Sequence, residues 1–592
     1  MKSLRLPLLV VFVALLAACA SQGMKSAANN ENAQLHALFD DYWETYLSEF
    51  PTSASYIGDQ RFNDRWSDMS LEAHERRNAL YRGYLERLAA IDRSELSELD
   101  QTNYDLFKRA LEGGLADYAS GNYLFPMTQS YGVQLAYDTA SLVSFENEAD
   151  YRDWILRLER YGDYVDQNIE LLQKGIETGF TQPAVITKLL IEQIEAQRVD
   201  DPAASDYYTP FTEMPDAIPE AKQETLRDAG LAAIRDVVLP AYARFENFMR
   251  EQYLPAARPA VGAWSMPGGR EYYAQRVKHY TTTDLTPEEI HQIGLREVAR
   301  IRAEMEKIID EVGFEGDFQA FLEYLRTDPK FYFEDPQELL EAYRNTAKRI
   351  DPELVNLFHI IPRTPYGVTP IPAPIAPYTY TAYYSGPAAD GTRAGYFYVN
   401  LYRPEVRPKY EIEALTMHES VPGHHFQIAR AMELGKLPDF RRYGESYTAF
   451  VEGWALYAES LGEMIGLYQD PYSKFGQLTY EMWRAVRLVV DTGMHYKEWT
   501  REQAVDYFMA NAAKTEKDIN NEIDRYISWP GQALAYKIGE LKIKELRARA
   551  EAALGEDFDL KAFHDEVLGA GAVPLDVLER RIDAWITEQK RN

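Results

Sequence analysis

The sequence has one cysteine among its 592 residues, which excludes an internal disulfide framework. It also lacks a lysine- or arginine-rich run, and its formal net charge is −30. Because binding to a phosphate backbone requires neutralising cations, this charge balance argues against nucleic acid as a partner. We find no internal repeat.

Apolar and aromatic residues, by contrast, are plentiful. Hydrophobic residues make up 46% of the chain and aromatic residues 13%, with 42 tyrosines. This supply can fill a sizeable core, so long disordered stretches are not expected. Tyrosine has an apolar body and a polar tip, so the excess also suits a solvent-lined cleft.

The N-terminal segment MKSLRLPLLVVFVALLAACASQG has the character of an export signal, with an apolar run too short for a comfortable membrane-spanning helix. Its LAAC stretch resembles the lipobox of bacterial lipoproteins, in which the signal is cut before a cysteine that then carries lipid. We therefore expect a signal peptide over residues 1–18, a linker over 19–32 and a membrane tether through lipid on Cys19. Ala20 stands where some lipoproteins have aspartate, which by resemblance to enterobacterial lipoproteins favours the outer membrane, facing the periplasm.

Apolar residues at three- and four-residue spacing predict helices through most of the chain. We expect an N-terminal helical lobe over residues 33–257 and a C-terminal catalytic lobe over 258–592, which share one cleft. Thr286-Pro287-Glu288-Glu289 predicts a capped helix start in the second lobe. The stretch YTAYYSGPAADGTRAGYFYVNLY, residues 380–402, predicts two short strands about a turn. The expected fold is mainly α, large and two-lobed, with one small β-sheet just before the segment HESVPGHH.

That segment starts at His418 like the HExxH motif of zinc proteases, but Pro422 stands where the second histidine should be. On an ideal helix His424 lies about 240° round from His418, and His425 lies roughly 10 Å further along the axis. Pro422 has no N–H to donate to the carbonyl four residues back, and Gly423 tolerates unusual backbone angles. A widened turn in the helix can therefore bring His424 to the ligand position, with His425 as the alternative.

A zinc site of this kind needs a third protein ligand, and the helical stretch SYTAFVEGWALYAESLG offers two glutamates. Glu452 follows His424 by 28 positions, which leaves room for a turn and a returning antiparallel helix. We therefore expect Glu452 to complete the ligand set. Glu459, two turns further on, is expected either to support a ligand or to lie at the surface. Two imidazoles and a carboxylate suit Zn²⁺ but also admit other transition ions.

Four segments, HESVPGHH, VEGWALYAES, RLVVDTGMHYKEW and YISWPGQALAYKIGELK, look like the bacterial family called domain of unknown function 885. The resemblance spans nearly all of the mature chain. That family is similar to the glutamate-ligated zinc peptidases, or gluzincins, with HExxPGHH in place of HExxH. It also resembles dipeptidyl peptidase III, whose lengthened motif adds one residue rather than two. The resemblance implies a zincin-like helical fold, His418, His424 and Glu452 as Zn²⁺ ligands, and Glu419 as the general base.

Several polar residues on a later helix could serve the same cleft. Arg484, Arg487, Asp491 and His495 recur at spacings of three and four, so they share one helical face. His495 could contact the substrate carbonyl oxygen, with Asp491 orienting the ring. The alternative is an exposed, salt-bridged helix.

Residues before, on and after this helix are further candidates for binding a substrate. Tyr536 could donate to the transition state or simply pack, and Lys537 could anchor a peptide carboxylate. Arg487 and His425 are further candidate substrate-binding residues. The strand GYFYVNLY could align a substrate by backbone pairing, with Asn400 pointing towards the cleft or away from it.

The sequence thus predicts an envelope-tethered zinc metallopeptidase that hydrolyses peptide bonds, in oligopeptides rather than in folded proteins. Glu419 would take a proton as water attacks the scissile carbonyl and would pass it to the leaving amine. Two alternatives stay open. One is a catalytically inactive lipoprotein that binds peptides or a partner protein, and the other is a zinc amidase that acts on cell-wall peptides.

Overall fold

The computed structural model describes residues 31–591, except for 374–375, 377–380, 388–392, 436 and 445. The predicted signal peptide, Cys19 and most of the predicted linker lie outside this part of the chain. Within it, no helix is both long and apolar enough to cross a membrane. Residues 31–49 are helical, so the last two residues of the predicted linker already belong to a helix.

The first part of the chain is helical, as predicted. Short π-helical turns at Ile234–Val238 and Met249–Tyr253 interrupt its last helices. The α-helices that follow residue 49 are α2 (Pro51–Ile57), α3 (Leu71–Ala89), α4 (Glu98–Ala119), α5 (Glu148–Glu159), α6 (Tyr161–Thr178), α7 (Ala184–Ala196), α8 (Thr209–Thr212), α9 (Glu220–Ala233), α10 (Leu239–Phe248) and α11 (Leu254–Ala256).

The second part is also mainly helical, and the predicted capped start is confirmed. Thr286 accepts a hydrogen bond from the backbone of Glu289, and the Glu289 carboxylate accepts one from the backbone of Thr286. The helices are α12 (Gly269–Thr281), α13 (Pro287–Glu311), α14 (Phe318–Thr327), α15 (Pro336–Ile350), α16 (Leu354–Leu357), α17 (Ile412–Glu419), α18 (His424–Met432), α19 (Thr448–Ser460), α20 (Pro471–His495), α21 (Arg501–Asn511), α22 (Glu516–Ser528), α23 (Ala535–Leu554), α24 (Leu560–Leu568) and α25 (Leu575–Gln589).

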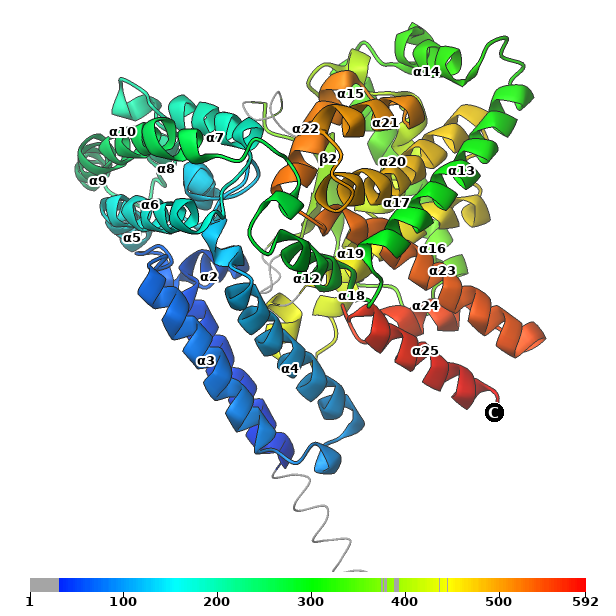
Figure 1. The fold of residues 1–592 in the computed structure, drawn as a ribbon, viewed down its shortest axis with the longest axis horizontal. Helices are drawn as coiled ribbons and strands as arrows, with labels where there is room; N and C mark the ends of the chain where they lie inside the picture. Colours follow the sequence, from blue (N-terminus) through cyan, green and yellow to red (C-terminus); the bar gives the residue numbers. More distant parts are fainter. Residues whose placement is uncertain are drawn as a thin grey trace, which may run out of the picture.

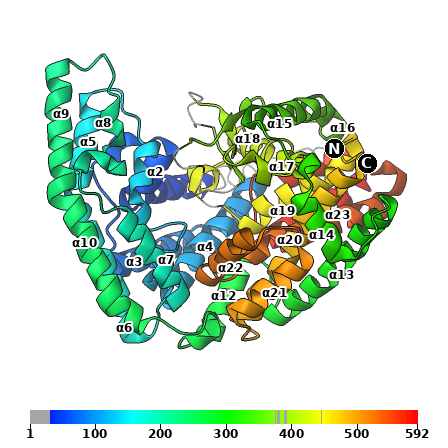
Figure 2. The ribbon, with the colours of Figure 1, turned by 90° about the horizontal axis from the view of Figure 1, so that it is seen from above.

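The helices gather in two groups. Figures 1 and 2 show α5, α6, α9 and α10 at one side of the molecule and α13, α20, α21 and α23 at the other. One cluster of buried apolar side chains nevertheless contains residues from both groups, among them Trp154 and Val489. A second cluster surrounds the sheet and includes Phe397 and Trp454. The division between residues 257 and 258 stays a prediction.

The small sheet has three strands, β1 (Tyr366–Pro370), β2 (Ala382–Ser385) and β3 (Gly395–Val399). Their order is β1-β3-β2, with β1 parallel and β2 antiparallel to β3. The two predicted strands are confirmed, and β1 comes from the proline-rich stretch before them. Because β3 is central and paired on both sides, the prediction that it aligns a substrate is wrong. Asn400 is 1% exposed and donates to the carbonyl of Ala376, so it points into the protein.

Candidate metal centre

The motif HESVPGHH lies on two helices rather than one. α17 ends at Glu419 and α18 begins at His424, with residues 420–423 between them. The Val421–Pro422 peptide bond is cis. The predicted widened turn is therefore wrong in form, because the helix stops completely and a second helix starts.

Two contacts fix the break between these helices. Trp454 Nε1 donates to the carbonyl of Pro422 at 2.8 Å, which ties the turn to α19. A Cβ on Gly423 would lie 1.9 Å from the carbonyl oxygen of His418, so only glycine allows this close approach. The proline and the glycine of the motif therefore each have a structural role.

The break brings together three of the residues expected to bind a metal. Nε2 of His418 and Nε2 of His424 each lie 3.5 Å from Oε2 of Glu452. The potential ligand atoms of the three residues all lie within 4.8 Å of one another. Ligands at about 2.0–2.2 Å from a tetrahedral ion are about 3.4 Å apart, so the glutamate stands at the separation from each imidazole that one shared ion needs.

The environment of Glu452 tests whether a metal fits this site. Its Oε2 atom is buried and has no hydrogen-bond partner among the described residues, although two imidazole nitrogens face it. A buried carboxylate oxygen without a partner costs free energy, which a cation at this point would remove. Two imidazoles and one carboxylate are also the donor set of many catalytic zinc sites. The residues present therefore fit a zinc ion.

Neighbouring groups orient both imidazoles. Nδ1 of His418 lies 2.8 Å from Oε1 of Glu459, which is fully buried. This carboxylate holds the ring proton on Nδ1 and leaves Nε2 facing the site, as partners of metal-binding histidines do. Gln427 Nε2 lies 3.1 Å from Nδ1 of His424 and donates to the carbonyl of Val451 at 2.7 Å. Two roles were considered for Glu459, supporting a ligand or lying at the surface. Its position against His418 agrees with the first.

The electrostatics of the site favour positive charge at the same point. Burial lowers the pKa of His418, but the carboxylates of Glu452 and Glu459 outweigh it and raise the value to about 9. Burial raises the pKa of Glu452, but the two histidines hold it well below its usual range. Two carboxylates therefore stabilise a cation beside His418.

Glu419, the expected general base, follows His418 directly at the end of α17. Glu419 is 9% exposed. Within the described part of the chain, no hydrogen bond or ion pair to its carboxylate is found, so both oxygens can accept a proton.

Helix α19, which carries Glu452, touches α23 through two glycines that the sequence analysis missed. A Cβ on Gly539 would lie 1.8 Å from the carbonyl oxygen of Ala449, and one on Gly453 would lie 2.5 Å from Cα of Gly539. The two backbones can meet only because neither position has a side chain. Glycine inside the helical patterns EGWA and KIGE was the available signal.

His425 is not part of this site. Its Nδ1 lies 2.9 Å from the hydroxyl of Tyr384, and its Nε2 lies 3.1 Å from the carbonyl of Thr364. Both ring nitrogens are thus occupied, and burial lowers the pKa of the ring to about 4. The geometry brings His424, and not His425, together with His418 and Glu452. His425 joins α18 to the sheet region and has no free ring nitrogen for a substrate.

The polar face of α20 is buried, so the alternative of an exposed salt-bridged helix is wrong. His495 accepts from the backbone of Ala263 at 3.0 Å and donates to the carbonyl of Tyr526 at 2.9 Å. Asp491 accepts instead from the hydroxyl of Tyr273 and the backbone of Gly531. Asp491 therefore does not orient His495, and His495 has no free nitrogen for a substrate carbonyl.

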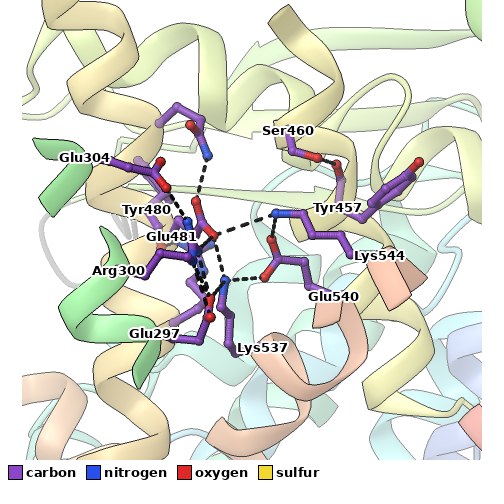
Figure 3. A network of polar contacts seen from close by, with 12 residues as sticks. Glu297, Arg300, Glu304, Tyr457, Ser460, Tyr480, Glu481, Lys537, Glu540 and Lys544 are labelled. Atoms are coloured by element: carbon purple, nitrogen blue, oxygen red, sulfur yellow. Dashed lines mark hydrogen bonds and ion pairs between the residues drawn. The ribbon is translucent and has the colours of Figure 1, made fainter. Parts of the chain in front are cut away.

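Lys537 lies in a buried ion cluster. Its Nζ is 2.5 Å from Glu540, 2.7 Å from Glu481 and 3.2 Å from Glu297, and the side chain is fully buried. Figure 3 shows these carboxylates converging on the lysine from three helices. A cation already paired with three carboxylates cannot anchor a peptide carboxylate, so that prediction is wrong.

Arg487 and Tyr536 contact each other. The guanidinium carbon of Arg487 lies 4.3 Å from the centroid of the Tyr536 ring. Arg487 also donates to the hydroxyl of Tyr526 and to Glu522, and it is 3% exposed. The Tyr536 hydroxyl accepts from Arg525 at 3.3 Å. None of these contacts involves the metal-site residues, and the roles expected for Arg487 and Tyr536 stay predictions.

Comparisons with known proteins agree with this architecture. A family model described as "Bacterial protein of unknown function (DUF885)" matches residues 51–582. A crystal structure of a "putative lipoprotein" from Colwellia psychrerythraea is 30% identical, with a TM-score of 0.89 over 94% of this chain and 99% of that one. A "putative lipoprotein of unknown function" from Shewanella oneidensis shares the fold at 19% identity, with a TM-score of 0.70 over 92% of this chain and 98% of that one. No curated protein matches the chain.

Proposed function

The chain belongs to the bacterial family DUF885, and from this premise we propose that it is a zinc-dependent metallopeptidase. The observation that carries the proposal is the buried Oε2 atom of Glu452, which has no hydrogen-bond partner and faces Nε2 of both His418 and His424. Glu419, the proposed base, follows His418 directly at the end of α17. Three ligands with an adjacent free carboxylate are the parts that metal-assisted hydrolysis requires.

In this proposal His418, His424 and Glu452 hold the ion, which when bound would polarise the scissile carbonyl and activate water as a nucleophile. Glu419 accepts a proton from the attacking water and transfers it to the leaving nitrogen. The carbon–nitrogen bond then breaks, which yields a carboxylate and an amine. Glu459 keeps the Nδ1 proton of His418 in place throughout.

The substrate we propose is an oligopeptide in an extended conformation. Among the described residues, β2 is an edge strand of the sheet and has only four residues, and a peptide can add to such an edge by backbone hydrogen bonds. A folded protein would have to present an unpaired strand to do the same, so short or unstructured peptides suit the edge better.

We propose that the enzyme acts in the cell envelope, attached through lipid on Cys19. The LAAC stretch at the N-terminus supports lipidation, and the similar structure from Colwellia psychrerythraea is described as a "putative lipoprotein". Replacement of Cys19 by serine is expected to move the protein from the membrane fraction to the soluble fraction. Fractionation of inner and outer membranes tests the proposed outer-membrane location.

The proposed activity is tested by incubating the Zn²⁺-loaded protein and its chelated form with a mixed peptide pool and analysing the products by mass spectrometry. We expect cleavage only in the metal-loaded sample. Stoichiometric zinc without cleavage of any peptide would favour the inactive binding protein. Cleavage confined to the amide bonds of cell-wall peptides would favour the amidase.

A further inference from the structure

We propose that Arg407 binds the C-terminal carboxylate of the peptide substrate at the start of strand β2, so that the enzyme acts at the carboxyl end of peptides. This inference rests on the proposed peptidase function and adds the class of substrate and the end at which it is cut.

Arg407 is held at the N-terminal end of β2. Its Nη1 donates to the hydroxyl of Thr381 at 3.3 Å, and its Nε donates to the carbonyl of Tyr402 at 3.0 Å. Thr381 directly precedes β2, and its carbonyl accepts from the backbone of Asn400 just after β3. The guanidinium is therefore fixed to the end of the sheet by two neutral oxygens.

Arg407 has no direct ion-pair partner within the described chain, although the carboxylates of Asp518 and Glu411 attract its charge from further away. No described carboxylate forms an ion pair with it, whereas Arg403 nearby pairs with Glu405 at 3.0 Å and Lys514 pairs with Glu411 at 2.8 Å. Arg407 is half-buried, and burial lowers its pKa. A partly desolvated guanidinium whose hydrogen-bond partners are neutral oxygens can bind a carboxylate through two parallel hydrogen bonds.

Arg407 and the expected general base share a neighbour. Tyr343 on α15 is 2% exposed. Burial raises the pKa of Tyr343, the negative charges of Glu411 and Glu419 add to the rise, and the positive charge of Arg407 opposes it. Helix α17, which carries Glu419, packs against β2, and Arg407 is hydrogen-bonded to the residue that precedes β2, so both groups belong to the same region of the protein.

The charge of Arg407 also sets the direction of a bound peptide. Within the described chain, β2 pairs with β3 on one side and with no strand on the other. A peptide that adds to the open side in antiparallel fashion has its carboxyl end at the start of β2, beside Arg407. The parallel direction would bring an ammonium group towards the same cation. Arg407 therefore favours the antiparallel direction and a free C-terminal carboxylate.

The inference is tested with pairs of peptides that differ only in a free or amidated C-terminus. We expect the Zn²⁺-loaded enzyme to prefer the free acid by about 10- to 100-fold in kcat/KM, the range for one charge-assisted hydrogen-bond pair. Arg407→Gln should lose this preference through a fall in kcat/KM for the acid alone. Turnover of the amide in the same variant shows that the protein is folded and loaded.

Arg403→Gln is the matched control. The side chain of Arg403 is 56% exposed and already paired with Glu405. The substitution removes the same charge as Arg407→Gln, from the same segment. We expect it to keep the preference for the free acid. Arg407→Lys, which retains a cation but not the paired geometry, should keep part of it and serves if Arg407→Gln does not fold.

A binding measurement separates this inference from the proposed function. In the Zn²⁺-loaded Glu419→Gln protein, calorimetry should give a lower Kd for the acid than for the amide, and the additional change Arg407→Gln should equalise them. Equal kcat/KM for acid and amide in the wild type, or equal Kd in Glu419→Gln, overturns the role of Arg407 while leaving peptide hydrolysis intact. Absence of any hydrolysis contradicts the proposed function instead, and the Kd comparison still decides the role of Arg407.

Discussion

Two clusters of charged side chains in the C-terminal half differ in how their charges are compensated. The histidine site consists of His418, His424 and Glu452. The lysine cluster, drawn in Figure 3, consists of Glu297, Arg300, Glu481, Lys537, Glu540 and Lys544. In the lysine cluster three carboxylates meet three cations of Lys or Arg, whereas Glu452 in the histidine site faces two imidazole nitrogens at 3.5 Å.

This difference teaches that buried charge alone does not mark a functional site. The lysine cluster joins α13, α20 and α23, and each of its charged groups touches one of opposite sign. Lys537, the member that the sequence pattern suggested as an anchor for a peptide carboxylate, is therefore structural. Glu452 in the histidine site faces two imidazole nitrogens, an arrangement that a metal ion fits. The two clusters differ in whether their buried carboxylates are paired with Lys or Arg side chains.

The largest effect is expected from Glu419→Gln. This carboxylate accepts no hydrogen bond from the described chain, so its loss should leave the fold and the bound zinc in place. We expect kcat to fall by about 10²- to 10⁴-fold, the contribution typical of a positioned general base. Peptide turnover and zinc content are measured on the same preparation. Unchanged turnover would remove Glu419 from this role.

Lys537→Met should show the opposite pattern. The change leaves Glu481 and Glu540 buried with too little positive charge, which typically costs about 3–5 kcal/mol of folding free energy. Denaturant unfolding should register this loss. The zinc content of the protein that remains folded should not change. Loss of zinc without loss of stability would contradict this and show that Lys537 contributes to the metal site.

Glu459→Gln tests the support of the metal site. Gln can still accept from Nδ1 of His418 but has no charge, so we expect the affinity for Zn²⁺ to fall by about 10- to 100-fold. Competition with a chromogenic chelator measures the change. Glu463→Gln, a nearby exposed carboxylate paired with Lys474, should bind zinc like the wild type.

Asp491 represents a third case, a buried carboxyl that meets only neutral donors. Burial raises its pKa from 3.8 to about 7, although Tyr273 and Gly531 donate to it and oppose the rise. Because the folded-state pKa is the higher one, stability that is complete below pH 3.8 is lost as the pH rises to about 7.

Asp491→Asn should therefore flatten the fall in melting temperature across that pH window. Removing the buried charge raises the free energy of unfolding at pH 8 by at most about 4 kcal/mol. The unpaired amide N–H of asparagine offsets about 1–3 kcal/mol of this gain. We expect a net gain of about 1 kcal/mol at pH 8. Parallel wild-type and variant curves of melting temperature against pH would show that Asp491 is ionised in the folded protein.

Local sequence patterns predicted much of the fold. The helical periodicity, the cap at Thr286 and the hairpin of β2 and β3 depend on neighbours within a few residues, so the sequence alone was sufficient. The candidate ligands were also accessible, since the two histidines lie within one short motif and Glu452 on the next long helical stretch. The parallel partner β1 depends on pairing across an intervening segment, for which no local signal exists.

The environment of each charge was not predictable from spacing. His495 and Asp491 lie on one helical face, but their partners come from the backbone of Ala263 and from Tyr273, more than 200 residues earlier. Likewise, the complete break after Glu419 depends on a hydrogen bond from Trp454 to the turn. Spacing identifies which side chains share a face, but tertiary contacts decide whether that face is exposed, paired or open to a ligand.

The most direct test of the account is the zinc content of the purified, dialysed protein and of Glu452→Gln, measured by mass spectrometry of the metal. We predict one equivalent of zinc per chain in the wild type and a large loss in the variant, because its neutral amide replaces the carboxylate between the two imidazoles. No zinc in wild-type protein supplied with the ion, or an unchanged equivalent in the variant, would contradict the claim that His418, His424 and Glu452 share one metal ion.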